Sequence, residues 1–197
     1  MDSEAQNEGL RARVRAAYSL AVEKPGGKHP FPVGREFALS VGYPACVLDA
    51  LPVPAVDAFC GTSNLSLTAA IHTGSTVLDL GCGAGMDCFI AASRTGAAGR
   101  VIGVDFSRSM LARAEASHSP GMHLIFLQAS AELLPLRRAS MDIALVNGIF
   151  NLNPMRGAIF GELARVVRPG GYAFATEIIR REPAGADEVI TDDNWFA

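Results

Sequence analysis

The feature that most constrains this chain is an apolar run, Val77–Leu80, that stops at three alternately spaced glycines. These glycines are Gly81, Gly83 and Gly85, and they lack the β-carbon that would prevent a tight turn or the close approach of a ligand to the backbone. Twenty positions later a second apolar run ends at Asp105, whose carboxylate suits the two hydroxyls of a ribose. A strand, a glycine turn, a helix and a strand ending in an acid form half of a nucleotide-binding α/β unit.

The spacing of the glycines indicates which nucleotide the loop binds. A dinucleotide-binding loop has its third glycine at the position where this chain has Met86. Asp79 precedes the first glycine by two residues, and the whole pattern resembles motif I of the class I S-adenosylmethionine-dependent methyltransferases. S-adenosylmethionine carries no phosphate, and a carboxylate near the loop can serve its ammonium group. A nicotinamide-dependent oxidoreductase is therefore the less favoured alternative.

Composition excludes several classes of partner. The 197 residues are 49% hydrophobic and carry a net charge of −3, with no strongly basic stretch, so we expect no nucleic-acid partner. No apolar run approaches the length of a membrane span and no leader is evident, so we expect no membrane association. The four cysteines form no C-x-x-C pair, which predicts neither a metal site nor a disulfide framework and fits a cytoplasmic location.

Hydrophobic periodicity divides the chain into a lead segment and a main domain. Residues 9–22 are predicted to form an amphipathic helix, and residues 35–72 several short helices with prolines at their first turns. We expect residues 1–75 to form an N-terminal helical cap on an S-adenosylmethionine-binding α/β domain, residues 76–197.

The main domain alternates strands with helices. The predicted strands are 76–80, 100–104, 122–127, 142–147 and 172–178, and the predicted helices are 86–95, 108–117 and one from Asn153-Pro154 through Val167. Pro169-Gly170-Gly171 is expected to turn into the last strand. This alternation predicts a doubly wound, mostly parallel sheet with right-handed crossovers, a Rossmann-like fold that binds its ligand at the carboxyl ends of the strands.

With these elements placed, the chain from about residue 9 onward resembles the arsenite methyltransferases and the ubiquinone/menaquinone-biosynthesis methyltransferases. Seven stretches carry the resemblance: Val14–Tyr18, Gly42–Pro44, Val77–Cys88, Gly99–Ser107, Ala131–Pro135, Asn147–Leu152 and Arg168–Gly171. The resemblance also implies two further strands at the end of the sheet. About twenty residues follow the fifth strand, so we expect the C-terminal strands to be missing. Either the chain is a truncated form of a longer protein, or another subunit covers the exposed apolar edge and the protein is a homo-oligomer.

The resemblance implies roles for individual residues. Asp79, Gly81, Cys82 and Gly83 would line the methionine part of S-adenosylmethionine, and Asp105 would hold the ribose. Phe106 and Met110 would lie against the adenine, with Ser130, Ala131 and Glu132 at its rim. Asn147 would lie beside the sulfonium, and Tyr18 would close over the cofactor. Each of these side chains except Asp105 is also readily explained as ordinary packing or backbone support.

The arsenite methyltransferases hold arsenic with cysteine thiolates at three motifs. Cys60 matches the first of them, but the second has Gly148 in place of the thiol, and the chain ends at the third, Asn194–Ala197. One thiolate cannot chelate arsenite, so arsenite methylation is an alternative to the main reading.

The favoured function is in-line transfer of a methyl group from S-adenosylmethionine to a small-molecule acceptor. The sulfonium is already activated, so the protein needs chiefly to align the acceptor and exclude water. The four histidines are scattered and none ends a core strand, so no catalytic residue is assigned. A catalytically degenerate module that only binds the cofactor is the remaining alternative.

Overall fold

The computed structural model describes residues 2–23, 27–118 and 121–179 of the chain. Its centre is a five-stranded sheet in which every neighbouring pair runs parallel. The strands are β1 (Thr76–Leu80), β2 (Arg100–Asp105), β3 (Leu124–Gln128), β4 (Met141–Asn147) and β5 (Val167–Thr176), in the order β3-β2-β1-β4-β5. The order reverses between β1 and β4, so the predicted doubly wound α/β fold is confirmed.

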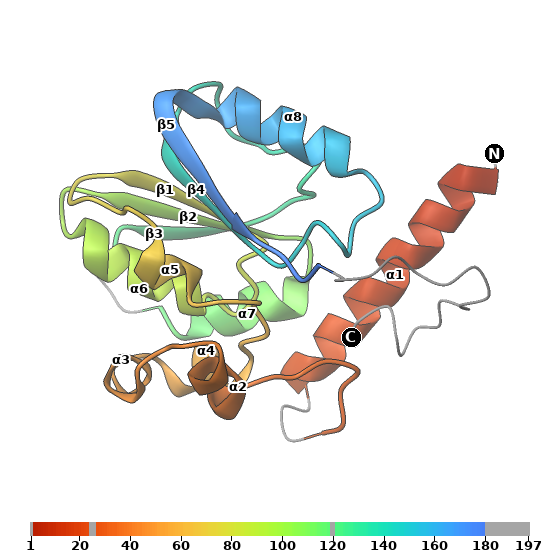
Figure 1. The fold of residues 1–197 in the computed structure, drawn as a ribbon, viewed down its shortest axis with the longest axis horizontal. Helices are drawn as coiled ribbons and strands as arrows, with labels where there is room; N and C mark the ends of the chain where they lie inside the picture. The colour runs from red at the N-terminus through yellow and green to blue at the C-terminus, as the bar shows by residue number, and fades with distance from the viewer. Residues whose placement is uncertain (1, 24–26, 119–120, 180–197) are drawn as a thin grey trace.

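Helices cover both faces of the sheet (Figure 1). Helices α6 (Met86–Thr95) and α7 (Arg108–Ala116) lie on one face, and α8 (Arg156–Val166) lies on the other. Each face has its own buried cluster, one that includes Val77 and Leu111 and one that includes Leu78 and Ile159. Adjacent residues of β1 thus serve opposite cores, because successive side chains of a strand point to opposite faces.

The lead segment contains the predicted short helices. They are α2 (Arg35–Ser40), α3 (Ala45–Asp49), α4 (Val53–Asp57) and α5 (Leu65–Thr68). They follow the long helix α1 (Asp2–Glu23), which begins seven residues before the predicted helix 9–22. Pro44 and Pro52 directly precede α3 and α4, where a missing backbone N–H costs nothing. Arg94 of α6 donates to the carbonyls of Ser66, Leu67 and Ala69 at 2.5–3.0 Å, and this contact ties α5 to the main domain.

In the main domain the starts of three elements differ from those predicted by two residues or more. Strand β3 begins at Leu124, two residues later than expected. Helix α8 begins at Arg156 rather than at Pro154, because the backbone of Met155 is not helical, with φ of −98° and ψ of 42°. The Asn153 side chain still accepts from the Met155 amide at 2.8 Å, as a helix cap would. Strand β5 begins at Val167, and the predicted Pro169–Gly171 turn is an irregularity inside it: Met141 pairs with Val167, while Ile143 pairs with Tyr172.

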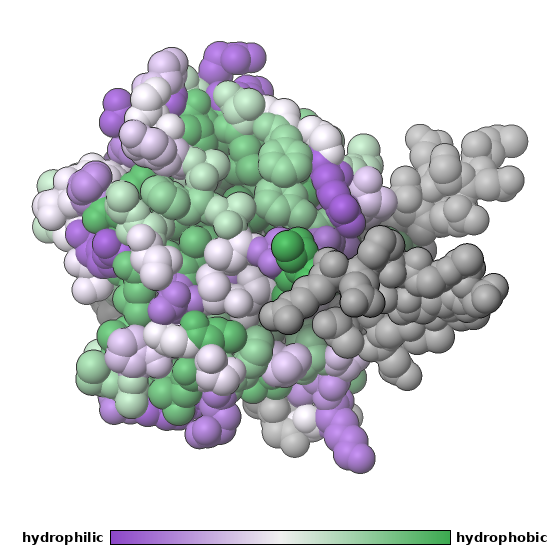
Figure 2. Space-filling view, in the orientation of Figure 1, coloured by the Kyte–Doolittle hydropathy of each residue, from purple (hydrophilic) through white to green (hydrophobic). Residues whose placement is uncertain are grey.

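Strand β5 is an edge of the sheet within the described residues. It carries Tyr172, which is 65% exposed, and the chain beyond it continues with the exposed Ile178 and Ile179. Figure 2 shows hydrophobic residues gathered in the region of β5 and α8. The expected lack of further strands concerns residues that lie outside the described part of the chain. Among the described helices, none is both long enough and apolar enough to cross a bilayer.

Candidate functional site

A cavity opens at the carboxyl ends of β1, β2 and β4, where the strand order reverses, and its empty space, including the part open to solvent, is about 1100 Å³. This is the position at which open parallel sheets bind their ligands. All the residues predicted from the sequence line it: Tyr18, Asp79, Gly81, Cys82, Gly83, Asp105, Phe106, Met110, Ser130, Ala131, Glu132 and Asn147. The fold therefore brings the predicted residues together, and their individual contacts with a ligand stay predictions.

Asp105 is the last residue of β2 and is 7% exposed. One of its carboxylate oxygens accepts a hydrogen bond from the Gly83 amide at 2.9 Å and the other from the Ser107 amide at 2.7 Å. Burial raises the pKa of Asp105, and the backbone hydrogen bonds oppose that shift. The carboxylate is thus held in one orientation between the glycine loop and the start of α7, at the wall of the cavity.

The glycine loop has the conformation that its composition requires. Gly81, Gly83 and Gly85 have φ angles of 80°, 52° and 86°, the left-handed region that residues with a β-carbon avoid. A β-carbon on Gly81 would collide with the side chain of Ile149. The loop therefore places bare backbone between β1 and the cavity.

A second acid, Asp87, lies in the first turn of α6 and lines the cavity with Asp79. Burial raises the pKa of both carboxyl groups, and the charge of Asp87 raises the pKa of Asp79 further. Asp79 accepts from the Cys88 thiol at 3.0 Å, and Asp87 accepts from the hydroxyls of Tyr43 and Ser66. Two buried carboxyl groups at one cavity suit a cationic ligand. A positive charge there would favour their ionised forms and offset the energetic cost of burying them.

The end of the cavity near β2 is aromatic and apolar. Met110 is 1% exposed, and the Arg15 guanidinium lies 5.4 Å from the centre of the Phe106 ring. Tyr18 of α1 stacks on Phe31 with the ring centres 4.5 Å apart, and burial raises the pKa of its phenol. These side chains suit a flat heterocycle, and α1 covers this end of the cavity.

The loop that follows β3 forms another wall. Ser130 donates to one carboxylate oxygen of Glu132 at 2.5 Å, and Asn153 donates to the other at 2.8 Å. Ser130 thus points to the carboxylate of Glu132, two residues further on.

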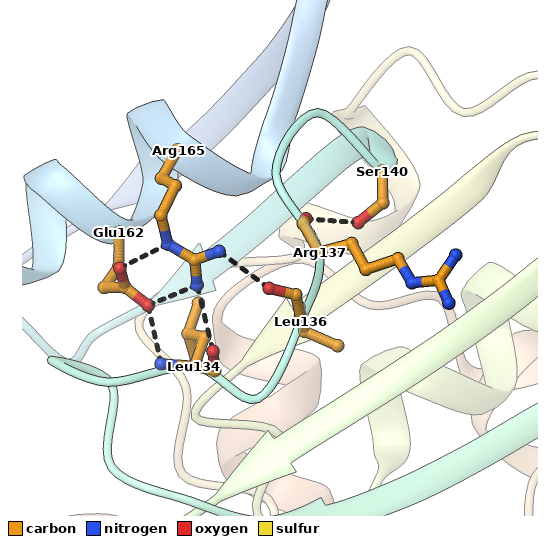
Figure 3. Close-up of polar contacts among 6 residues, drawn as sticks. All are labelled: Leu134, Leu136, Arg137, Ser140, Glu162 and Arg165. Carbon is orange, nitrogen blue, oxygen red and sulfur yellow. Dashed lines mark hydrogen bonds and ion pairs between the residues drawn. The ribbon is translucent and has the colours of Figure 1, made fainter.

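Helix α8 anchors the same loop further along (Figure 3). The Glu162 carboxylate accepts from the Leu134 amide at 2.6 Å, and Arg165 donates to the carbonyls of Leu134 and Leu136. Arg165 and Glu162 also pair with each other at 2.6 Å. The ion pair therefore satisfies both an amide donor and two carbonyl acceptors of this turn.

Asn147, at the end of β4, uses its side-chain amide in contacts with the protein. Its oxygen accepts from the Thr62 amide at 2.8 Å, and its nitrogen donates to Asp87 at 2.9 Å. Asp87, Phe59 and Cys60 line the cavity but were not predicted as site residues. The available signal for Asp87 was its place just after the glycine loop, which also fits an acid that only stabilises a helix N-terminus.

The cysteines differ in their surroundings. Cys60 lines the cavity, and burial, followed by the charge of Asp105, raises the pKa of its thiol to about 12. Gly148, where the resemblance to arsenite methyltransferases implies a second thiol, also lines the cavity. Among the described residues, no group of three or more His, Cys, Asp or Glu side chains could hold a metal ion.

Comparison with known proteins agrees with this geometry. The sequence profile of the methyltransferase domain matches residues 71–194. The chain belongs to this methyltransferase family. An arsenite methyltransferase of Halobacterium salinarum is 35% identical over 136 residues, which are 68% of this chain and 35% of that protein. A demethylmenaquinone methyltransferase of Lactococcus lactis is 35% identical over 107 residues, 53% of this chain and 42% of that protein.

Solved structures of methyltransferases share the fold. An arsenic(III) S-adenosylmethionine methyltransferase from Chlamydomonas reinhardtii aligns with a TM-score of 0.58 and 28% identity, over 74% of this chain and 49% of that one. A [4+2]-cyclase aligns with a TM-score of 0.55 and 24% identity, over 60% of this chain and 44% of that one, and shows only that the fold is shared. The resemblance predicted from the motifs is confirmed, and this methyltransferase-family chain spans less than half the length of the two curated relatives.

Proposed function

We propose that the protein binds S-adenosylmethionine and transfers its methyl group in line to a small-molecule acceptor. The observation that carries the proposal is Asp105, held by the Gly83 and Ser107 amides at the wall of a cavity that also contains Asp79 and Asp87. A fixed carboxylate suits the ribose hydroxyls, and the two further acids suit the positive charges of this cofactor. When bound, S-adenosylmethionine supplies an activated methyl group on a sulfonium.

The residues of the chain would bind and align rather than exchange protons. Backbone of the glycine loop allows close approach at Gly81 and Gly83, and Phe106 and Met110 offer apolar contacts to an adenine. Tyr18 and α1 would exclude water from the reacting centre. Positioning alone can contribute about 7–11 kcal/mol to such a displacement.

Cofactor binding is tested by calorimetric titration with S-adenosylmethionine and its demethylated product. We expect micromolar binding by the wild type and at least tenfold weaker binding by Asp105→Ala, since the ribose contact is lost. Asp49→Ala is the matched control, because Asp49 lies on α3 in an exposed ion pair with Arg35. Absence of binding by the wild type, or equal binding by Asp105→Ala, would contradict the proposal.

Methylation of arsenite is a second candidate. The relatives favour it, and Cys60 lies in the cavity wall. Gly148 opposes it, because the second thiol is absent there, and the third motif, 194–197, lies outside the described residues. Turnover with arsenite and glutathione that is lost in Cys60→Ser would favour this candidate. Cofactor binding without turnover on any acceptor would instead indicate a degenerate binding module.

The remaining expectations complete the proposal. Residues 1–75 would act as a cap on an S-adenosylmethionine-binding domain of residues 76–197. The protein would work in the cytoplasm, without nucleic acid, and would self-associate through the exposed edge of β5.

A further inference from the structure

We propose that Asn147 and Asp87 form a clamp that positions the loop of residues 60–64 as one wall of the cavity. This wall lies at the end of β4, across the glycine loop from the predicted ribose site, and we call it the acceptor side. The clamp itself is argued from geometry, and its consequence for the acceptor rests on the proposed methyl transfer. In this role Asn147 is a positioning residue that acts through the loop.

Both the oxygen and the nitrogen of the Asn147 side-chain amide form hydrogen bonds with the loop. Its oxygen accepts from the backbone amides of Thr62 at 2.8 Å and Ser63 at 3.3 Å, and from the Thr176 hydroxyl at 3.0 Å. Its nitrogen donates to the Ser63 carbonyl and to Asp87, both at 2.9 Å. The amide thus satisfies backbone groups of the loop. Few of its own hydrogen-bonding groups remain for a ligand.

Asp87 fixes which way the amide faces. The hydroxyls of Tyr43 and Ser66 donate to one of its oxygens, so the other oxygen is presented to Asn147. A flipped amide would set its oxygen against this carboxylate and its nitrogen against the Thr62 amide. Because Asp87 is 6% exposed, water cannot readily relieve such a conflict.

Close packing seats the loop on the end of β4. A β-carbon on Gly61 would lie 2.6 Å from the Asn147 nitrogen, and one on Gly148 would lie 2.8 Å from the Thr62 methyl group. The loop cannot move toward β4, and the hydrogen bonds of Asn147 stop it from moving away.

The clamp and the predicted ribose site stand on different sides of the glycine loop. Asp105 ends β2 and Asn147 ends β4, and these strands flank β1 in the sheet. Gly61 lies against Asn147 at the end of β4, whereas its neighbour Cys60 packs against the cluster of Ala58, Ala84 and Met110. Loosening the clamp should therefore free the loop at its β4 end and expose Cys60.

Three of the four cysteines supply the test. The protein is treated with iodoacetamide, and the alkylation rate of each cysteine is measured by peptide mass spectrometry. Cys60 reports the loop, the exposed Cys46 is the reference, and the buried Cys88 reports global unfolding. Asn147→Asp keeps the shape of the side chain but sets an oxygen against both Asp87 and the Ser63 carbonyl.

In Asn147→Asp we expect Cys60 to react at least tenfold faster in the ligand-free protein, with Cys88 still protected. Combining Asn147→Asp with Asp87→Asn restores a donor to the pair and should recover at least half of the lost protection. Asn153→Asp is the matched control, because Asn153 contacts Glu132 in the loop after β3, and it should leave Cys60 unchanged.

Three results would overturn the clamp. The first is an unchanged Cys60 rate in Asn147→Asp. The second is a double variant, Asn147→Asp with Asp87→Asn, that recovers none of the lost Cys60 protection. The third applies if Asn147→Asp exposes Cys88 by unfolding: the milder Asp87→Asn alone must then raise the Cys60 rate about threefold, and no increase would reject the clamp. A wild type that binds no cofactor would refute the proposed function and leave the Cys60 result standing.

Discussion

Single residues at this site are constrained by backbone conformation as much as by chemistry. A β-carbon on Gly81, which has φ of 80°, would collide with Ile149, whereas one on Gly83, which has φ of 52°, would lie 3.8 Å from the Met110 sulfur. The two glycines belong to one motif but do not tolerate a side chain equally well. The first needs both its conformation and its small size, and the second mainly its conformation.

We therefore expect Gly81→Ala to destabilise the protein more than Gly83→Ala. A β-carbon in the left-handed region costs about 1–2 kcal/mol at either position, and at Gly81 the displaced Ile149 adds to this cost. The difference should appear as a thermal midpoint several degrees lower for Gly81→Ala, measured by calorimetry. Equal midpoints would mean that Ile149 moves aside freely.

Among the elements, the loop after β3 depends on α8 for its shape. The ion pair of Glu162 and Arg165 satisfies backbone groups of Leu134 and Leu136 that no strand satisfies. Hydrogen bonds from Arg165, followed by the one from the Leu134 amide, lower the pKa of Glu162, while its partial burial opposes them. A helix on one face of the sheet thus orders a loop that lines the cavity.

Arg165→Met should loosen this loop. We expect amide hydrogen exchange in residues 129–137 to accelerate at least tenfold, because two carbonyls lose their donor. Arg138→Met, a change at an exposed arginine of the following turn, should leave the exchange rates unchanged. In the wild type the same loosening should appear at acid pH. A carboxyl group with a lowered pKa stabilises the fold above its ordinary value of 4.5, and this contribution is lost as the pH falls through the lower folded value.

For the whole molecule, buried acids make stability depend on pH in the opposite sense. The pKa of Asp79 is raised in the folded protein, first by burial and then by the charge of Asp87. Between pH about 4 and the raised pKa of about 8, the unfolded chain has lost this proton while the folded protein keeps it. Folding then binds a proton, so the free energy of unfolding falls as the pH rises across this interval.

We expect the thermal midpoint of the ligand-free protein to fall by at least about 3 °C between pH about 5 and about 8. One pKa unit corresponds to about 1.4 kcal/mol, and at this chain length 1 kcal/mol moves the midpoint by about 2–4 °C. Asp79→Asn, which cannot titrate, should flatten this slope when both proteins are measured by calorimetry. A slope that survives the substitution would assign the effect to other groups.

The exposed edge of the sheet gives a second expectation for the whole molecule. Tyr172 on β5 is 65% exposed, and an unpaired apolar strand favours pairing with another copy. We expect concentration-dependent self-association in sedimentation experiments and its reduction by Tyr172→Lys. A wild type that stays monomeric at about 100 µM would show that this edge does not pair.

Local patterns were enough to identify the sheet, the glycine loop and Asp105. An apolar run, a set of glycines and an acid at a strand end lie close together in the chain, and the rules of parallel sheets place their carboxyl ends at one site. The starts of α8 and β5 were predicted incorrectly, because the backbone of Met155 leaves the helical region and a strand irregularity takes in Gly170, whatever the local signals of proline and glycine.

The surroundings of Asp87 and Asn147 arise from contacts between distant parts of the chain. Asp87 meets Tyr43 across 44 positions and Asn147 across 60, and Asn147 meets Thr62 across 85. No local pattern specifies such pairs, since each depends on how the lead segment packs on the finished sheet. The amino-acid sequence by itself thus predicts where a nucleotide binds. The opposite wall of the cavity, the loop of residues 60–64, forms only when the lead segment has folded onto β4 and α6.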